Sequence, residues 1–418
     1  MCNYITIILM FISVFGTSIN VDSLLLNANT NIEKANAYIK VAELYKDNDV
    51  NKYMSNYVLA LKYAQKLNND SLVGSIKTNL GIAYINANKL KEAEKQLNSA
   101  YYNFFNISND YGIAEVYTSL GRLKYFQKNY VSAHEYWEEA LNIYKLLGNN
   151  IKIAGAYSNV AVIHGVLGDN KTALKNFKLS AKILEKEQNK KHLTSTYINI
   201  GITYMKLGDY TNAERFLNKA VYLKKIIGDE IGISYTYLNL SQLFFQKNDF
   251  KKSLDYSLKS LDIKQKLNYL GEITKNYNII CQIYINIEEY DNALNYALEG
   301  LRISEENNII KDEASFNKYI SEIYNKIGET ERANYYLHEY NTLKDSLIKL
   351  ENYDKEKAIT NNKENETVIT DTLINKSSDK NNKIKKTTSI NHYIIISSII
   401  VLLFITAIII IILIKKRK

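Results

Sequence analysis

Proline is missing from the whole 418-residue chain, although an average composition would supply roughly 20. Because the proline ring removes a backbone donor and breaks helices, its absence leaves no residue of that kind to end a helix. Turns must therefore be made by Gly, Asn, Asp and Lys. The absence also excludes a polyproline ligand segment and a stiff proline-rich linker.

Cysteine is scarce as well, with only Cys2 and Cys281 in the chain. Two cysteines cannot build a disulfide framework, and no CxxC motif occurs. A glycine-rich phosphate loop is also missing, since even the GxG core of such a loop does not occur. No GxSxG motif offers a nucleophilic serine. These absences argue against redox, nucleotide and hydrolase chemistry.

Histidines are few and scattered along the chain: His134, His164, His192, His338 and His392. No two of them stand four residues apart on one helix, so the sequence predicts no zinc site. Glutamate pairs such as Glu138 and Glu139 are typical of a solvated helix surface. We therefore predict no catalytic residue, no metal and no cofactor, and we do not expect an enzyme.

The net charge is +9, but it is spread along the chain with one local excess near the C-terminus. Lysine alternates with glutamate and aspartate, and no single basic stripe emerges. Nucleic-acid binding is therefore not predicted. The hydrophobic content of 46% is enough for most of the chain to bury apolar surface and fold.

The dominant positive feature is a period of 40 residues. Small residues recur at Gly81, Gly121, Ala161, Gly201, Ser241, Cys281 and Ser321. Twelve positions later stand Ala93, Ala133, Ala173, Ala213, Ser253, Ala293 and Ala333. Three positions after the first series come Tyr84, Lys124, His164, Tyr204, Phe244, Tyr284 and Tyr324, most of them aromatic. A fixed period of this size is typical of a repeat array.

Each unit is predicted to contain two helices. In the unit that starts at Thr196, apolar residues spaced three and four apart form a first stripe, and Gly208-Asp209 provides a helix end and a cap for the second stripe. Two antiparallel helices joined by a short turn must approach closely where they cross. The recurring Gly and Ala residues are expected to allow this approach.

In most units a small residue is followed three positions later by an aromatic residue, nine positions after that by an alanine, and then by a bulky apolar residue. This pattern resembles the tetratricopeptide repeat. The 40-residue spacing resembles the long variant of that repeat. Seven copies cover residues 75–350 and a divergent eighth covers 31–67, so the array is expected to span 31–350. The resemblance implies an all-α, right-handed α-solenoid of helix-turn-helix repeats. The family's proline is missing, and tyrosine replaces its early tryptophan, as at Tyr117, Tyr157, Tyr197, Tyr237 and Tyr277.

The two ends predict a membrane protein. Residues 4–15 are apolar, and Gly16 and Ser18 suit a signal peptidase, so residues 1–18 are predicted to be a signal peptide. The alternative is an apolar helix that belongs to the fold. The segment from Tyr393 to Ile414 is uncharged over 22 residues, or about 33 Å of helix, and predicts a single transmembrane helix after the solenoid. Residues 354–391 are predicted to be a flexible polar stalk.

The orientation of this segment depends on the signal peptide. Four basic residues precede the segment and four follow it, so the local charge does not decide. A signal peptide would place the repeats outside the cytoplasm, on the periplasmic side of the cell membrane, with residues 415–418 as a basic cytoplasmic tail. Without it, the protein would be tail-anchored with cytoplasmic repeats.

The candidate binding residues stand two positions before the small residues. Asn79, Asn159, Asn199 and Asn239 share this phase with Ser119. An amide offers a donor and an acceptor, as a peptide backbone does. The resemblance implies that such asparagines face a concave groove and bind an extended peptide; the alternative is a recurrence inherited with the repeat. Neighbouring groove positions are Arg122, Tyr125, Phe126, Met205, Lys206, Gln242 and Phe245.

Two functions remain open. The first is a membrane-anchored, non-catalytic scaffold that binds a peptide or protein partner in its groove, with homo-oligomerisation as an open option. The second follows from a resemblance of signal peptide, repeat array and membrane span to the sensory input region of bacterial signalling proteins. Those proteins continue into a histidine kinase or DNA-binding output domain, which this alternative expects the chain to lack or to have lost.

Overall fold

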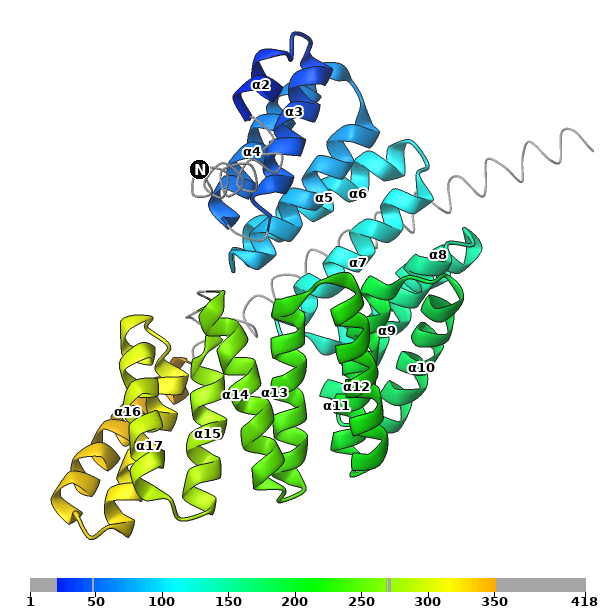
Figure 1. Cartoon of the computed structure of the whole chain (residues 1–418). Coiled ribbons are helices and arrows are strands. Elements are labelled where there is room, and N and C mark those ends of the chain that lie inside the picture. Colours follow the sequence, from blue (N-terminus) through cyan, green and yellow to red (C-terminus); the bar gives the residue numbers. More distant parts are fainter. Residues whose placement is uncertain (1–20, 47–48, 268, 270–271, 351–418) are drawn as a thin grey trace, which may run out of the picture. The chain divides into compact units, whose positions relative to one another are not determined.

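The computed structural model describes residues 21–46, 49–267, 269 and 272–350. The chain divides into two compact units, Met1–Asp345 and Ser346–Lys418, and all numbered helices belong to the first. Every regular element within the described ranges is a helix, which confirms the all-α prediction (Figure 1).

The helices follow one another with short turns and pack as pairs. Their bounds are α2 Val21–Leu26, α3 Asn31–Leu44, α4 Val50–Ala64, the 3-10 helix Gln65–Leu67, α5 Asp70–Asn86, α6 Leu90–Asn106, α7 Asp110–Phe126, α8 Tyr130–Leu146, α9 Asn150–Val166, α10 Asn170–Lys186, α11 Lys190–Lys206, α12 Tyr210–Ile227, α13 Glu230–Gln246, α14 Phe250–Lys266, α15 Thr274–Asn286, α16 Tyr290–Glu306 and α17 Ile310–Lys326. Residues 330–350 are also helical. From α5 on, odd numbers mark the first helix of a repeat and even numbers the second, so the predicted helical repeat solenoid is confirmed.

Residues with left-handed backbone occur at 20-residue intervals from 68 to 248 and again from 288 to 328, each at the end of a helix. These residues are Asn68, Asn88, Ser108, Lys128, Gly148, Gly168, Gln188, Gly208, Gly228, Asn248, Glu288, Asn308 and Gly328. The turn within a repeat and the turn between repeats therefore have the same form. Glycine is the residue that adopts this conformation without strain, yet here Asn, Ser, Lys, Gln and Glu adopt it too.

The residue after most turns caps the next helix, although Lys89, Glu289 and Ile309 do not. Asp or Asn occupies this position before nine of the helices, and its side chain accepts a hydrogen bond from a backbone N–H in the first turn. For example, Oδ1 of Asp209 lies 3.0 Å from the backbone nitrogen of Asn212. Hydrogen bonds from Asn212 also hold the pKa of Asp209 below its ordinary value. These caps therefore define where the helices begin.

The recurring small residues lie where the two helices of a repeat cross. A methyl group added to Gly81 would lie 2.7 Å from the side chain of Leu97, and one added to Gly201 would lie 2.7 Å from Leu217. Both distances are shorter than van der Waals contact allows. The prediction that these residues permit close helix approach is confirmed.

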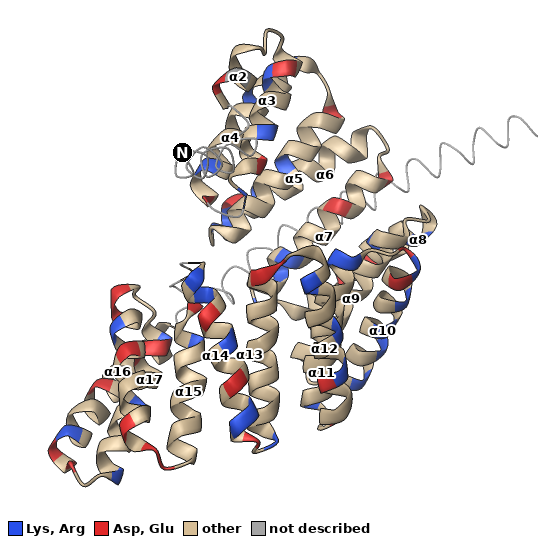
Figure 2. Cartoon of the chain, viewed as in Figure 1, with Lys and Arg blue, Asp and Glu red and all other residues tan. Residues whose placement is uncertain are grey.

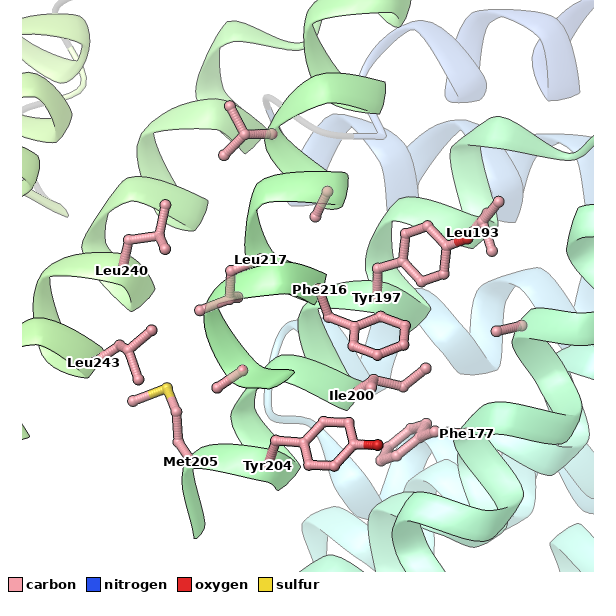
Figure 3. Packing of buried hydrophobic residues seen from close by; sticks show 14 of the residues in the cluster. Phe177, Leu193, Tyr197, Ile200, Tyr204, Met205, Phe216, Leu217, Leu240 and Leu243 are labelled. Carbon is pink, nitrogen blue, oxygen red and sulfur yellow. The ribbon is translucent and has the colours of Figure 1, made fainter. Parts of the chain in front are cut away.

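Aromatic residues fill the space beside the crossing. The ring of Phe216 on α12 lies 5.5 Å from Tyr197 and 5.8 Å from Tyr204, both on α11 (Figure 3). Tyr256 is placed in the same way between Tyr237 and Phe244 in the next repeat. One buried cluster runs from Ala154 to Phe244, and the next runs from Leu261 to Ala333.

The membrane predictions concern other parts of the chain. No helix within the described ranges is both long enough and apolar enough to cross a membrane. The predicted signal peptide (1–18), stalk (354–391), transmembrane segment (393–414) and basic tail (415–418) lie outside the described residues.

Candidate interaction face

The first helices of successive repeats contact one another directly. α5 contacts α7, α11 contacts both α9 and α13, and α13 contacts α15. The solvent-facing side chains at the asparagine position of each repeat therefore lie on neighbouring helices. We call this surface on α5, α7, α9, α11 and α13 the A-helix face.

The asparagines of the face are half-buried and largely unpaired. The side chains of Asn79, Asn159 and Asn199 make no hydrogen bond to any described residue. Asn239 differs, because its Nδ2 donates to the backbone oxygen of Tyr235 at 3.0 Å. Three amides on α5, α9 and α11 thus keep their donors and acceptors available. The peptide-binding role of these residues stays a prediction.

Ser119 does not extend the row of amides on α7. It is buried, and its hydroxyl donates to the backbone oxygen of Glu115 at 3.0 Å. Arg122 follows on the same helix, where its guanidinium donates to Oδ1 of Asn86 at 2.8 Å and lies over the ring of Phe126. Burial lowers the pKa of Arg122. The α7 part of the face is therefore tied up in contacts within the chain.

The other candidate residues differ in how freely they face solvent. Tyr125 packs against Trp137 with ring centroids 6.1 Å apart, so it supports the core as much as the face. Gln242 is exposed and makes no hydrogen bond to a described residue, and Lys206 reaches the backbone oxygen of Gly165 at 3.4 Å. Phe245 contacts Phe250. Met205 was expected on the groove and instead belongs to the buried core, because its side chain packs between α11 and α13.

Charge is nearly absent from the centre of the face. From the turn of the asparagines to the C-terminal ends of α9, α11 and α13, the half-buried and exposed side chains on this face are Ser158, Asn159, Val162, Val166, Ile198, Asn199, Ile202, Lys206, Leu238, Asn239, Gln242, Phe245 and Gln246, of which Lys206 alone is charged. Two turns before Asn159, Lys152 is also charged and pairs with Glu115. The second helix α10, by contrast, carries five lysines and one glutamate (Figure 2). Depletion of charge is typical of the core of an interface.

Two histidines that look isolated in the sequence lie side by side. The ring centroids of His134 on α8 and His164 on α9 are 5.5 Å apart, because these helices pack across a repeat boundary. Each has a carboxylate neighbour: Glu138 Oε1 lies 3.9 Å from His134, and Asp169 Oδ2 lies 3.4 Å from His164. Across the described ranges, no group of three His, Cys, Asp or Glu residues is arranged to hold a metal ion.

Ion pairs at buried and half-buried positions are the feature that sequence reasoning missed. Lys124 occupies a position that is aromatic in most repeats, and its ammonium pairs with Glu94 at 2.8 Å inside the structure. Glu115 accepts hydrogen bonds from Tyr144 and, at 2.8 Å, from Lys152. The available signal was a lysine that breaks an aromatic series, as Lys124 does.

Open depressions lie away from the A-helix face. One of about 310 Å³ is lined by residues of α2 and α3, including Leu24, Glu33 and Lys40. Another is lined by Glu288 to Asn292 together with Ile327. Neither contains a candidate binding residue.

Comparison with protein families now places the repeats. Models of the tetratricopeptide repeat match residues 113–147, 152–221 and 193–266. The chain carries tetratricopeptide repeats. The matched residues include α9, α11 and α13, which form the centre of the A-helix face. No curated protein matches the sequence of the chain.

Solved structures share the fold of the array. The apo form of RapI is 16% identical with a TM-score of 0.53, over 66% of this chain and 99% of RapI. A STAND protein with a tetratricopeptide repeat sensor from Pyrococcus horikoshii is 17% identical with a TM-score of 0.61, over 80% of this chain and 53% of that protein. A Rap protein complexed with Competence and Sporulation Factor is 14% identical with a TM-score of 0.51, over 76% of this chain and 98% of that protein. These similarities show a common fold.

Proposed function

We propose that this protein is a non-catalytic tetratricopeptide repeat scaffold that binds a peptide or protein partner on the A-helix face. The observation that carries the proposal is the charge-poor centre of the face with unpaired amides at Asn159 and Asn199. The fold it shares with a Rap protein solved with Competence and Sporulation Factor supports a ligand-binding array.

The geometry of packed helices suits an extended ligand. Helices in contact lie about 8–10 Å apart, and an extended chain rises about 3.3 Å per residue, so each repeat spans about three ligand residues. Asn159, Asn199 and Asn239 would then meet the ligand backbone once in every three residues. Val162, Ile198 and Ile202 would contact the intervening side chains. A charged ligand residue would lose water there without meeting an opposite charge, so a neutral segment is favoured.

Membrane anchoring is the second part of the proposal and rests on the sequence alone. The uncharged segment from Tyr393 to Ile414 would hold the array at the cell membrane, and the predicted signal peptide would place the repeats outside the cytoplasm. A reporter that is active only outside the cytoplasm can be inserted near Asn361 or fused after Lys418. Activity at Asn361 alone is expected, whereas activity at the tail alone would overturn this orientation.

The binding experiment uses peptides selected from a random display library on the full-length protein. In the test variant Asn159, Asn199 and Asn239 are replaced together by alanine. The matched control replaces Asn142 and Asn218, which are exposed on the second helices α8 and α12. We expect the selected peptides to be poor in charged residues and to lose at least ten-fold in affinity for the test variant only. Equal affinity for a folded test variant would remove the amides from the proposal.

A sensory input region is the second candidate function. The observation that favours it is the similarity to the STAND protein with a tetratricopeptide repeat sensor. A histidine kinase or helix-turn-helix reading frame directly downstream in the DNA would favour this reading. An unrelated downstream frame would favour the scaffold.

A further inference from the structure

Helix α14 differs from every other second helix in what it buries. Its buried residues are Ser253, Ser257, Ser260, Leu261 and Lys264. The equivalent helix α12 buries Ala213, Phe216, Leu217, Ala220 and Val221. Along the chain, no buried apolar residue occurs between Phe244 and Leu261, and one of the divisions between the buried apolar clusters of the array lies at this place.

Two hydroxyls of this polar helix have no partner. The Oγ atoms of Ser257 and Ser260 are buried and make no hydrogen bond among the described residues. At the equivalent position of α10, Ser180 lies 2.9 Å from the hydroxyl of Ser158. Leu238 stands in the place of Ser158 beside Ser260 and cannot serve as a partner. A buried polar group without a partner weakens the contact that contains it.

A buried ammonium group stands at the C-terminal end of the same helix. Lys264 is fully buried, and its Nζ donates to the backbone oxygen of Glu272 and to Oδ1 of Asn276, both at 3.0 Å. It also lies 4.8 Å from the ring of Tyr235. No carboxylate among the described residues forms an ion pair with it, and burial lowers its pKa to about 8.

The following helix lacks the Asp or Asn cap that begins most helices of the array, as α6, α16 and α17 also do. α15 has 13 residues, and Ile273 precedes it without a side-chain hydrogen bond to the helix. Lys264 and Asn276 link α14 to α15, with Asn276 Nδ2 also donating to the backbone oxygen of Ser257 at 3.0 Å. The boundary therefore combines these buried hydrogen bonds with the apolar contacts of Leu261.

We propose that α14 is a joint in the array, where the helix opens locally more often than its neighbours and separates two cooperative folding units. The first of these folding units ends at α13, and the second folding unit begins at α15. The joint is independent of the proposed binding function. It nonetheless supports the A-helix face, because α13 carries Asn239, Gln242 and Phe245 and packs directly on α14.

Native-state hydrogen exchange of the full-length protein, followed by mass spectrometry, tests the joint. After correction for intrinsic rates, amides of α14 are expected to exchange at least ten-fold faster than those of α12. Equal exchange of α12 and α14 would overturn the proposal. The pair Ser241→Gly with Ser257→Leu copies the crossing of Gly201 and Leu217 and should slow exchange in α14 at least ten-fold.

Two milder substitutions keep the proposal testable if that pair does not fold. Ser260→Ala removes an unpaired hydroxyl and should slow exchange in α14 several-fold. Ser253→Ala is the matched control, because it removes a hydroxyl that donates to the backbone oxygen of Ser241 at 2.8 Å. It should accelerate exchange. If Ser260→Ala accelerates exchange as much as Ser253→Ala, the unpaired hydroxyls do not loosen α14 and the proposal fails.

Discussion

The crossing of α11 with α12 and the crossing of α13 with α14 solve the same packing problem differently. In the first, Gly201 leaves room that Leu217 fills. In the second, Ser241 and Ser253 exchange hydrogen bonds, each hydroxyl donating to the other residue's backbone oxygen at 2.8 Å, and Ser257 takes the place of the leucine.

The same relation holds along the array. Glycine or alanine on the first helix faces a large residue 16 positions later, as in Gly81 with Leu97, Gly121 with Trp137 and Ala161 with Phe177. Serine or cysteine on the first helix faces a small one, as in Ser241 with Ser257 and Cys281 with Ala297. The space at the crossing is fixed, and a side chain from either helix can fill it. Ser321 is an exception, because the residue 16 positions later is the large Leu337. The Leu337 side chain is 44% exposed, so it does not have to fit into the crossing.

The largest effect should come from emptying the α11–α12 crossing. Leu217→Ala leaves a cavity beside Gly201, and we expect the free energy of unfolding to fall by about 3–4 kcal/mol. Leu337→Ala in the same phase removes an exposed side chain and should cost less than about 1 kcal/mol. Urea unfolding followed by circular dichroism compares the two variants. Similar losses would show that the position, rather than the packing, decides the cost.

A smaller effect should come from overfilling the same crossing. Gly201→Ala places a methyl group 2.7 Å from Leu217 and should cost about 1–3 kcal/mol. Gly155→Ala is the matched control, since no atom lies within 4 Å of the added methyl. Because alanine favours helix, this control should gain about 0.5–1 kcal/mol. Thermal unfolding measures the change in stability of both variants. A gain in stability for Gly201→Ala would contradict the close approach of the two helices.

The pH dependence of the free energy of unfolding tests the buried Lys264 of α14. Burial lowers the pKa of Lys264 to about 8, whereas the pKa of a lysine in the unfolded chain is about 10.4. Between these values the unfolded state binds more protons, so stability rises as pH rises from 8 to 10. The Glu272 carboxylate opposes the lowered pKa and Lys275 adds to it.

The measurement is urea unfolding at pH 7 and at pH 9.5 for the wild type and for Lys264→Met. The wild type should gain about 1–2 kcal/mol relative to the variant over this interval. Tyrosines enter only at higher pH: burial raises the pKa of Tyr235 to about 12, and stability is lost above the unfolded value near about 10. Parallel curves for the two proteins would show that the buried amine does not titrate in this range.

The smallest effect concerns the turns that all repeats share. Glu288 adopts a left-handed backbone with φ of 61°, so Glu288→Gly should stabilise the protein by about 0.5–1 kcal/mol. Gly328→Ala, at φ of 86°, is the reverse test and should destabilise it by about 1 kcal/mol. Melting temperatures check both, and equal shifts of the same sign would contradict the turn assignment.

Much of the fold follows from the sequence because one period determines it. The phase of Gly81 to Ser321 identifies the first helices, and Gly208-Asp209 identifies a turn. The sequence could not reveal that Lys128 or Glu288 adopts the turn conformation, since neither prefers it. It also could not show that His134 approaches His164, because contacts across a repeat boundary depend on side chains 30 residues apart.

The candidate site was predictable only as a series of positions. The phase of Asn159 and Asn199 follows from the period, but their freedom from internal hydrogen bonds depends on which neighbours lie close. Asn239 shares that phase and bonds its own helix. Met205 is apolar, and its burial between α11 and α13 could not be separated from exposure on the face by spacing alone.

The most direct test of the account is hydrogen exchange of the full-length protein with and without a peptide selected from the random library. The account predicts slower exchange in the first helices α9, α11 and α13, with little change in the second helices α8 and α10. Protection confined to the second helices, or to the depressions near Glu33 and Glu288, would contradict the assignment of the A-helix face as the binding surface.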